Sequence, residues 1–195
     1  ACTHPDYRNR GAMRELLSQA FTRMLHNDMS ISTLIPAEPW LFGYYAGMGY
    51  VPVFKYSSTT FTASEVTIAD ETAVLNKIND YQEESYHYLN QKLRERPYCI
   101  QHTETDFRVI LADLQLGEGY VYTLKQGDKI TALAIVYPAG STWQAGEIVA
   151  ETPGMYPLLL QRICEQLNIP SIRVISPSET EPAPQVLGMA RIINA

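Results

Sequence analysis

The chain has 195 residues, of which 46% are hydrophobic and 18% are charged, and its formal net charge at pH 7 is −6. This composition is typical of a globular protein and excludes wholesale disorder. The negative charge argues against non-specific binding of nucleic acid, which needs a positive field. No apolar run reaches the length of about eighteen residues that a membrane span requires, and no secretory signal is visible.

The first 62 residues show an α/β order of elements. A helix begins near Gly11, with apolar residues at spacings of three and four. A buried strand over "ISTLIP", a short helix over "EPWLFGYYAG", and a turn with a long strand over "GMGYVPVFKYSSTTF" follow. This order implies right-handed crossovers between parallel neighbouring strands.

Residues 63–195 form the second part of the chain. We predict a helical stretch from Asp70 to the residue before Pro97, and a second helix with a capping box between Thr103 and Asp106. A β-hairpin that turns at residues 126–128 comes next. The predicted elements after it are a strand over 142–151, a helix over 153–168, and strands over 171–176 and 185–194.

The three cysteines, Cys2, Cys99 and Cys164, are widely spaced and odd in number. No Cys or His grouping has metal-ligand spacing, so we expect no metal site. The pattern favours reduced thiols in a cytoplasmic protein.

The entrance to the first helix is basic and carries a glycine, in the sequence "YRNRGAM". The first amides of a helix lack partners within it and carry the positive end of the helix dipole, which suits an anion. Arg8 and Arg10 add donors for phosphate oxygens, and Gly11 lets a phosphate approach the backbone. The residues alone equally allow solvated arginines and a glycine that only eases a turn.

The segment "HPDYRNRGAM" resembles motif A of the GNAT superfamily of acetyl-CoA-dependent N-acetyltransferases. Arg8, Gly11 and Met13 stand at the places of the Arg/Gln-x-x-Gly-x-Gly/Ala pattern, and the larger Met13 resembles the Eis type. The resemblance implies that the amides from Asn9 to Met13 hold the coenzyme A pyrophosphate and that the preceding strand end holds the pantetheine arm. The coenzyme-binding residues it implies are Ala1, Cys2, Thr3, Arg8, Asn9, Arg10, Gly11, Ala12 and Met13.

A second segment, "LFGYYAGMGYVPV", resembles the part of the GNAT fold that carries a catalytic tyrosine. Counting back from Gly49, the matching position is Tyr45, and Tyr44 is its neighbour. A phenol with the ordinary pKa of about 10 can protonate a thiolate leaving group. The alternative is that these tyrosines are core or interface aromatics.

The second part of the chain resembles a degenerate GNAT-like domain of Eis-type proteins. Thr152 can cap the helix that follows, with Pro153 at its first position and Gly154 next to it. No arginine or lysine lies nearby, so we expect no coenzyme there. We also expect the first domain to lack its leading half, and "LGMARIINA" to lead into a further domain.

The sequence thus predicts an α/β (α+β) protein with GNAT-like mixed twisted sheets flanked by helices, in two tandem units. Residues 1–62 are the C-terminal half of an acetyl-CoA-binding domain, and residues 63–195 are a degenerate one. The predicted activity is transfer of an acetyl group from acetyl-CoA to a small-molecule amine or a lysine, though the fragment itself need not be active. Exposed aromatics favour a homo-oligomer. The alternatives are a non-catalytic scaffold and a nucleotide-binding α/β protein.

Overall fold

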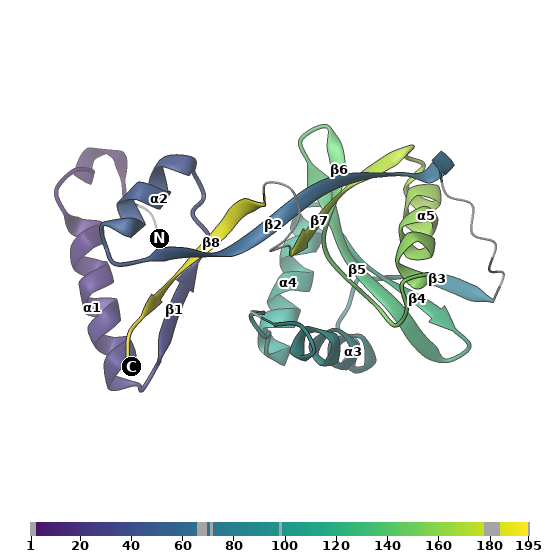
Figure 1. Ribbon diagram of the computed structural model, residues 1–195, viewed down its shortest axis with the longest axis horizontal. Helices are drawn as coiled ribbons and strands as arrows, with labels where there is room; N and C mark the ends of the chain where they lie inside the picture. Colours follow the sequence, from purple (N-terminus) through teal and green to yellow (C-terminus); the bar gives the residue numbers. More distant parts are fainter. Residues whose placement is uncertain (1–2, 66–69, 71, 98, 178–183, 195) are drawn as a thin grey trace. The chain divides into compact units, whose positions relative to one another are not determined.

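A computed structural model describes residues 3–65, 70, 72–97, 99–177 and 184–194. Eight strands and five α-helices lie within these residues, which confirms the predicted mixed α/β class (Figure 1). The chain forms two compact units, of which the first contains residues 1–56 and 178–195 and the second contains residues 57–177. Strand β2 contributes residues to each unit.

The first unit places two helices beside a small sheet. Its elements are a 3₁₀ turn (Pro5–Tyr7), α1 (Ala12–His26), β1 (Ile31–Leu34), α2 (Pro39–Ala46), the first half of β2 (Val51–Thr62) and β8 (Gln185–Ile192). Strand β8 lies between β1 and β2 and is antiparallel to both. Strands β1 and β2 therefore run in the same direction, but they are not neighbours as the sequence had predicted. The order of elements could not reveal that a strand from the end of the chain separates them.

The place of β8 differs from the predicted domain division. The sequence predicts that residues 185–194 belong to the second part of the chain and that "LGMARIINA" leads into a further domain. In the structure, Ile31 pairs with Ile192 and Val51 pairs with Ala190, so this segment completes the sheet of the first unit. The assignment of residues 1–62 and 63–195 to two GNAT-like domains stays a prediction.

The two faces of this small sheet have different surroundings. On the side of α1, Ser32 and Tyr50 are buried. On the other side, Ile31, Val51 and Ile192 are exposed and line an open groove of about 790 Å³. An exposed apolar surface of this kind is typical of a face that another molecule covers.

The second unit is a sheet with helices on both faces. Its elements are the second half of β2, a 3₁₀ turn (Ala63–Glu65), β3 (Ala73–Ile78), α3 (Glu83–Arg94), α4 (Glu104–Leu116), β4 (Tyr120–Gln126), β5 (Lys129–Ala139), β6 (Thr142–Ala150), α5 (Met155–Leu167) and β7 (Ser171–Pro177). The strand order is β2-β7-β6-β5-β4-β3. Strands β3 to β6 pair antiparallel in sequence order, whereas β6 and β7 are parallel because α5 crosses between them.

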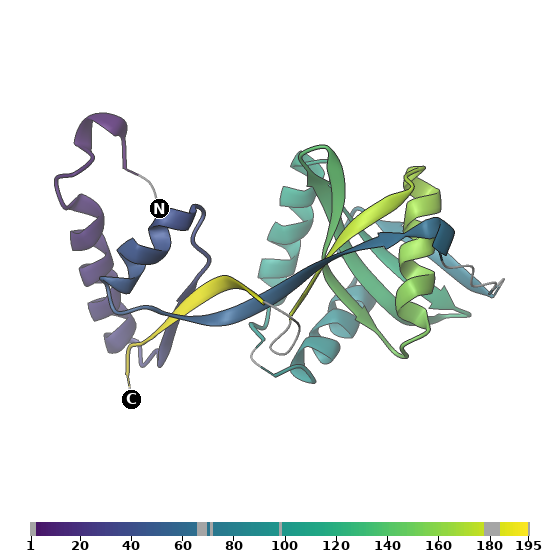
Figure 2. The ribbon, with the colours of Figure 1, turned by 45° about the horizontal axis from the view of Figure 1, so that its top comes forward.

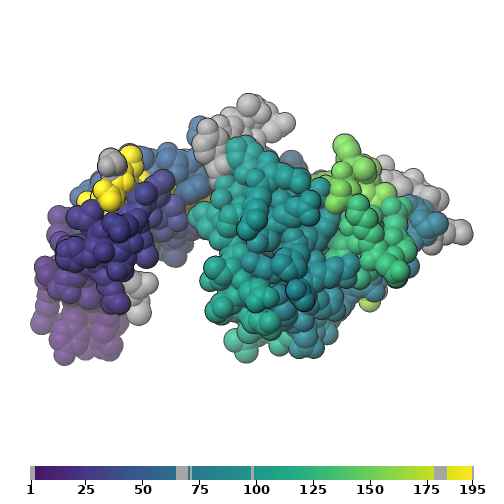
Figure 3. Space-filling view, turned by 90° about the horizontal axis from the view of Figure 1, so that it is seen from below, coloured from purple at the N-terminus to yellow at the C-terminus, as the bar shows by residue number. Residues whose placement is uncertain are grey.

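Helices cover both faces of this sheet (Figures 1 and 2). Two hydrophobic clusters lie between the sheet and these helices. Side chains alternate along a strand, so β4 places Tyr122 and Leu124 against α5 and Val121 against α3 and α4. Figure 3 looks onto the side of this unit that α3 and α4 cover. Phe107 of α4 and Leu159 of α5 are fully buried, and the main core of the protein therefore lies in this unit.

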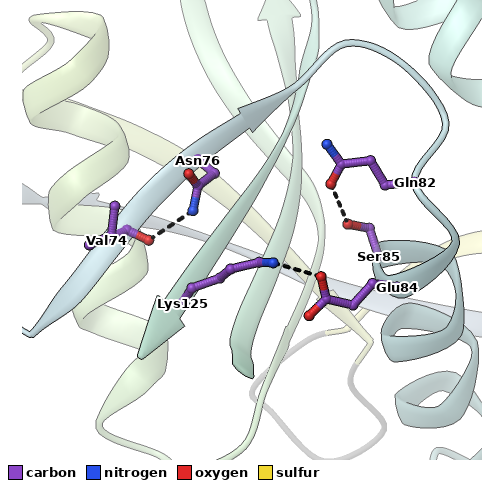
Figure 4. Close-up of polar contacts among 6 residues, drawn as sticks. All are labelled: Val74, Asn76, Gln82, Glu84, Ser85 and Lys125. Carbon is purple, nitrogen blue, oxygen red and sulfur yellow. Dashed lines mark hydrogen bonds and ion pairs between the residues drawn. The ribbon is translucent and has the colours of Figure 1, made fainter. Parts of the chain in front are cut away.

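One predicted helix is partly wrong. Residues 73–78 form strand β3, which pairs with β4 over its whole length, and only residues 83–94 of the expected stretch are helical. Figure 4 shows how the first turn of α3 is tied to the sheet: Lys125 of β4 lies 2.6 Å from the carboxylate of Glu84. Pairing with a long-range partner thus overrides a segment whose local pattern also suits a helix.

Candidate functional site

A tight turn leads into α1, where the sequence predicts an anion site. Asn9 and Gly11 both have a positive φ, of 62° and 81°. Asn tolerates this left-handed region and Gly enters it without cost, which explains both residue types at this turn. Ala1 and Cys2 of the predicted coenzyme-binding set lie outside the described residues, while Thr3 and residues 8–13 lie within them.

The backbone amides at this turn point to no described partner. The amide of Glu15 donates to the carbonyl of Gly11 at 3.0 Å, as in the first turn of any helix. Among the described residues, no hydrogen bond engages the amides from Asn9 to Met13, and no side chain caps the helix. A Cβ added at Gly11 would meet no atom within 4 Å. The amides and the helix dipole are therefore accessible to an anion.

The two arginines of the turn interact with the loop before it. The Nε atom of Arg8 donates to the carbonyl of Thr3 at 3.2 Å, and the guanidinium of Arg10 lies 5.3 Å from the ring centre of Tyr7. Neither side chain forms an ion pair with a carboxylate of the described residues. Both are exposed, so their positive charge adds to that of the helix end.

Tyr45 lies in the last turn of α2 and is half-buried. Its ring packs edge-on against the rings of Tyr44 and Tyr50, with centroid distances of 5.4 Å and 5.8 Å. Its carbonyl accepts hydrogen bonds from the amides of Met48 and Tyr50, at 2.9 Å and 3.1 Å. These contacts fix the backbone and ring of Tyr45, while no described residue forms a hydrogen bond with its hydroxyl, so that this group can meet a ligand.

Tyr50 anchors this aromatic group. Its hydroxyl lies 2.7 Å from the Oγ atom of Ser32 inside the unit, and its ring lies 6.0 Å from that of Phe21 of α1. Tyr50 is thus one of the tyrosines that pack as core residues, which was the alternative reading of this segment. No local pattern predicts its contact with Ser32, since the two residues are 18 positions apart in the chain.

The junction between β6 and α5 differs from its predicted form. The first residue of α5 is Met155 and its N-cap is Gly154, so Pro153 is not in the first turn. The side chain of Thr152 does not cap the helix; only its carbonyl accepts a hydrogen bond, from the amide of Met155 at 3.1 Å. The local composition suited a cap two residues earlier, but helix ends commonly shift by one or two positions.

Other kinds of site find no support in the described part of the chain. No group of three or more His, Cys, Asp or Glu side chains is placed to hold a metal ion there. None of the helices described combines the length and apolar character that crossing a membrane requires.

A family model matches the first part of the chain, which includes this turn. Residues 1–53 match the family model of the acetyltransferase (GNAT) domain. The comparison with curated protein sequences yields no match.

Solved structures share the fold over nearly the whole chain. A GCN5-related N-acetyltransferase from Anabaena variabilis matches with a TM-score of 0.71 and 18% identity, over 97% of this chain and 53% of that chain. Eis1 from Mycobacterium abscessus matches with a TM-score of 0.62 and 11% identity, over 97% and 54%. A tandem GNAT protein from the clavulanic acid biosynthesis pathway, solved without AcCoA, matches with a TM-score of 0.54 and 13% identity, over 100% and 74%.

The chain spans about half the length of the first two of these proteins. Its first 53 residues carry the turn, the helix α1 and the tyrosine segment described above, and these are the residues that the family model covers. The first 53 residues thus match the acetyltransferase (GNAT) domain model, and the chain has the fold of solved GCN5-related N-acetyltransferases.

Proposed function

We propose that the protein transfers an acetyl group from acetyl-CoA to a primary amine, either a small molecule or a lysine side chain. The observation that carries this proposal is the accessible row of amides from Asn9 to Met13, within the segment that matches the GNAT family model. The donor set fits a pyrophosphate, because it combines helix amides, a glycine without a nearby atom, and two guanidinium groups.

Each part of the site has a separate task. The amides and arginines bind and orient the pyrophosphate end of the coenzyme, while Tyr45 holds a proton at its hydroxyl. Acetyl-CoA supplies the acetyl group as a reactive thioester. In the overall transfer the amine nitrogen bonds to the acetyl carbon, the carbon–sulfur bond breaks, and the sulfur takes the proton of Tyr45. The amine releases one proton to solvent, and Tyr45 regains one from solvent. The net negative charge of the protein favours a cationic amine as acceptor.

A reducing compartment suits the thiols of the protein. Among the described residues, Cys99 and Cys164 are free cysteines, and burial raises the pKa of the Cys164 thiol to about 11. A thiol that stays protonated is a poor partner for disulfide exchange. We propose the cytoplasm as its location.

Binding of the coenzyme is tested by thermal denaturation. Acetyl-CoA at 100 times its Kd stabilises a protein by about 2.7 kcal/mol, which corresponds to roughly 5–10 °C for a chain of this size. Replacing both arginines of the turn (Arg8→Glu, Arg10→Glu) should remove this shift. The matched control is Lys129→Glu, Arg173→Glu, which makes the same change of net charge at exposed positions of the second unit. Equal shifts in the two double variants would contradict the pyrophosphate site.

Transfer is tested by release of coenzyme A thiol with a panel of amines and lysine peptides. We expect Tyr45→Phe to lower kcat by about a hundredfold or more, since a general acid contributes at least that much. The neighbouring change Tyr44→Phe serves as the control and should leave kcat within about twofold. Coenzyme binding without any thiol release in the wild type would favour the non-catalytic scaffold.

A further inference from the structure

Arg191 of β8 lies where three elements of the first unit meet. It pairs in register with Ser32 of β1, so both side chains project from the same face of the sheet. The guanidinium carbon of Arg191 lies 4.0 Å from the ring centre of Phe21, on α1. The side chain is half-buried, and no carboxylate of the described residues forms an ion pair with it. Its charge is instead directed at a ring and a backbone carbonyl.

The carbonyl belongs to the turn that follows α2. The Nη1 atom of Arg191 donates to the carbonyl of Met48 at 2.5 Å. The next residue, Gly49, has φ of +84°, and the guanidinium packs against it: a Cβ there would lie 3.6 Å from the Cζ atom. Arg191 therefore holds this turn by a charge-assisted hydrogen bond and by direct packing.

The turn at residues 48–50 also fixes the position of Tyr45. The amides of Met48 and Tyr50 both donate to the Tyr45 carbonyl, and the Tyr50 ring packs against the Tyr45 ring. A shift of residues 48–50 would move both the backbone and the ring contact of Tyr45. Arg191 touches none of the groups that we assign to the chemistry, so any effect on catalysis has to pass through the turn.

We propose that Arg191 is a positioning residue for Tyr45, an inference that rests on the proposed acetyl transfer. The guanidinium reaches from the last strand of the chain to the turn after α2 and keeps the phenol hydroxyl at a fixed place. Small displacements of an acid from its productive position lower the rate steeply, because proton transfer needs hydrogen-bond geometry.

The kinetic test is a double-mutant cycle in the full chain. We expect Arg191→Met to lower kcat by roughly tenfold or more while KM for acetyl-CoA stays within about twofold, and Arg191→Lys to recover part of the loss. In the Tyr45→Phe background, Arg191→Met should change kcat by less than about twofold. An equal fall of kcat in both backgrounds would show that Arg191 acts on folding in general and would overturn the proposal.

A second test does not depend on turnover. Hydrogen exchange of the amides of residues 48–50 should be roughly tenfold faster in Arg191→Met than in the wild type. The matched control is Arg173→Met, at an exposed arginine of β7; it should leave these amides unchanged. Unchanged exchange in Arg191→Met would refute the positioning role. If the wild type acetylates no amine, the proposed function fails, and the exchange rates alone decide whether Arg191 holds the turn.

Discussion

Replacing Gly11 by alanine separates the conformational role of this residue from its role in binding. Gly11 is the N-cap of α1 and has φ of +81°, and a Cβ there would meet no atom within 4 Å. The methyl group therefore costs backbone strain alone, about 1–2 kcal/mol. The smaller conformational freedom of alanine in the unfolded chain offsets about 0.4–1 kcal/mol of this. We expect a net loss of about 1 kcal/mol in the free energy of unfolding, or roughly 2–4 °C in Tm.

Binding of the coenzyme should suffer more than stability does. The methyl group of Gly11→Ala would lie among the amides that we assign to the pyrophosphate and would keep the anion away from them. A hydrogen bond to a charged group contributes about 1.5–3 kcal/mol, and each 1.4 kcal/mol changes Kd tenfold. The loss of one such bond therefore predicts a Kd for coenzyme A that is about ten- to a hundredfold higher.

The matched control is Gly127→Ala, at the tip of the β4–β5 hairpin. Gly127 also has a positive φ, of 58°, and its Cβ would also meet no atom within 4 Å. This variant shares the strain but belongs to the second unit, whereas the turn before α1 belongs to the first. Isothermal titration of both variants with coenzyme A measures the two Kd values, and thermal denaturation measures the two stabilities. Wild-type affinity in Gly11→Ala, or equal weakening in both variants, would refute the amide site.

Three predictions concern the second unit. Hydrogen bonds from Thr103 lower the pKa of Asp106. At a pH above its ordinary pKa the ionised carboxylate therefore stabilises α4, and this stabilisation is lost as the pH falls through the lowered pKa. Asp106→Asn should therefore flatten the acid side of a curve of unfolding free energy against pH, measured in urea. Leu159→Ala should cost about 2–5 kcal/mol in urea unfolding, because Leu159 is fully buried; a cost below about 1 kcal/mol would contradict this packing. Cys164 should resist iodoacetamide at pH 8 until urea unfolds the chain, as mass spectrometry can show, because burial raises its thiol pKa to about 11.

The sequence predicts those elements whose signals are local. The capping box of Thr103 and Asp106 is present as expected, with both of its hydrogen bonds. The hairpin turns at residues 127–128, between Gln126 and Lys129, which pair with each other. Such features depend on residues within a few positions of one another, and their geometry follows from the residue types there.

Strand β3 was missed because its signal is weak and its stabilising partner is distant. Residues 73–78 mix Ala, Leu and Lys with Val and Ile, and they stand directly before a clear helical pattern. They form a strand because they pair with β4 along their whole length. Ala73 pairs with Gln126 at one end and Ile78 with Val121 at the other. Pairing and burial against neighbouring strands decide such segments more than intrinsic preference does.

In the candidate site, too, residues with a local signal could be predicted and residues that depend on distant contacts could not. Residues 8–13 could be singled out from the sequence because a glycine between arginines before a helix is a local signal with a direct physical meaning. Ser32, Tyr50 and Arg191 could not, since their contacts join β1, α1, β8 and the turn before β2, and no pattern in residues 185–192 tells which strands they will pair with. Contacts between residues that are close in the chain can therefore be inferred from the sequence, whereas contacts between distant residues require the structure.

The turn before α1 and the turn that holds Tyr45 are stabilised by different elements of the first unit. The turn that we propose for anion binding is formed by residues 8–13 at the start of α1, whereas the position of Tyr45 depends on a strand that follows it by more than a hundred residues. The proposed coenzyme binding and the proposed proton transfer by Tyr45 thus depend on different parts of the chain. Because their supports are separate, a change at Gly11 should alter Kd and leave the Tyr45 turn intact, and a change at Arg191 should do the reverse.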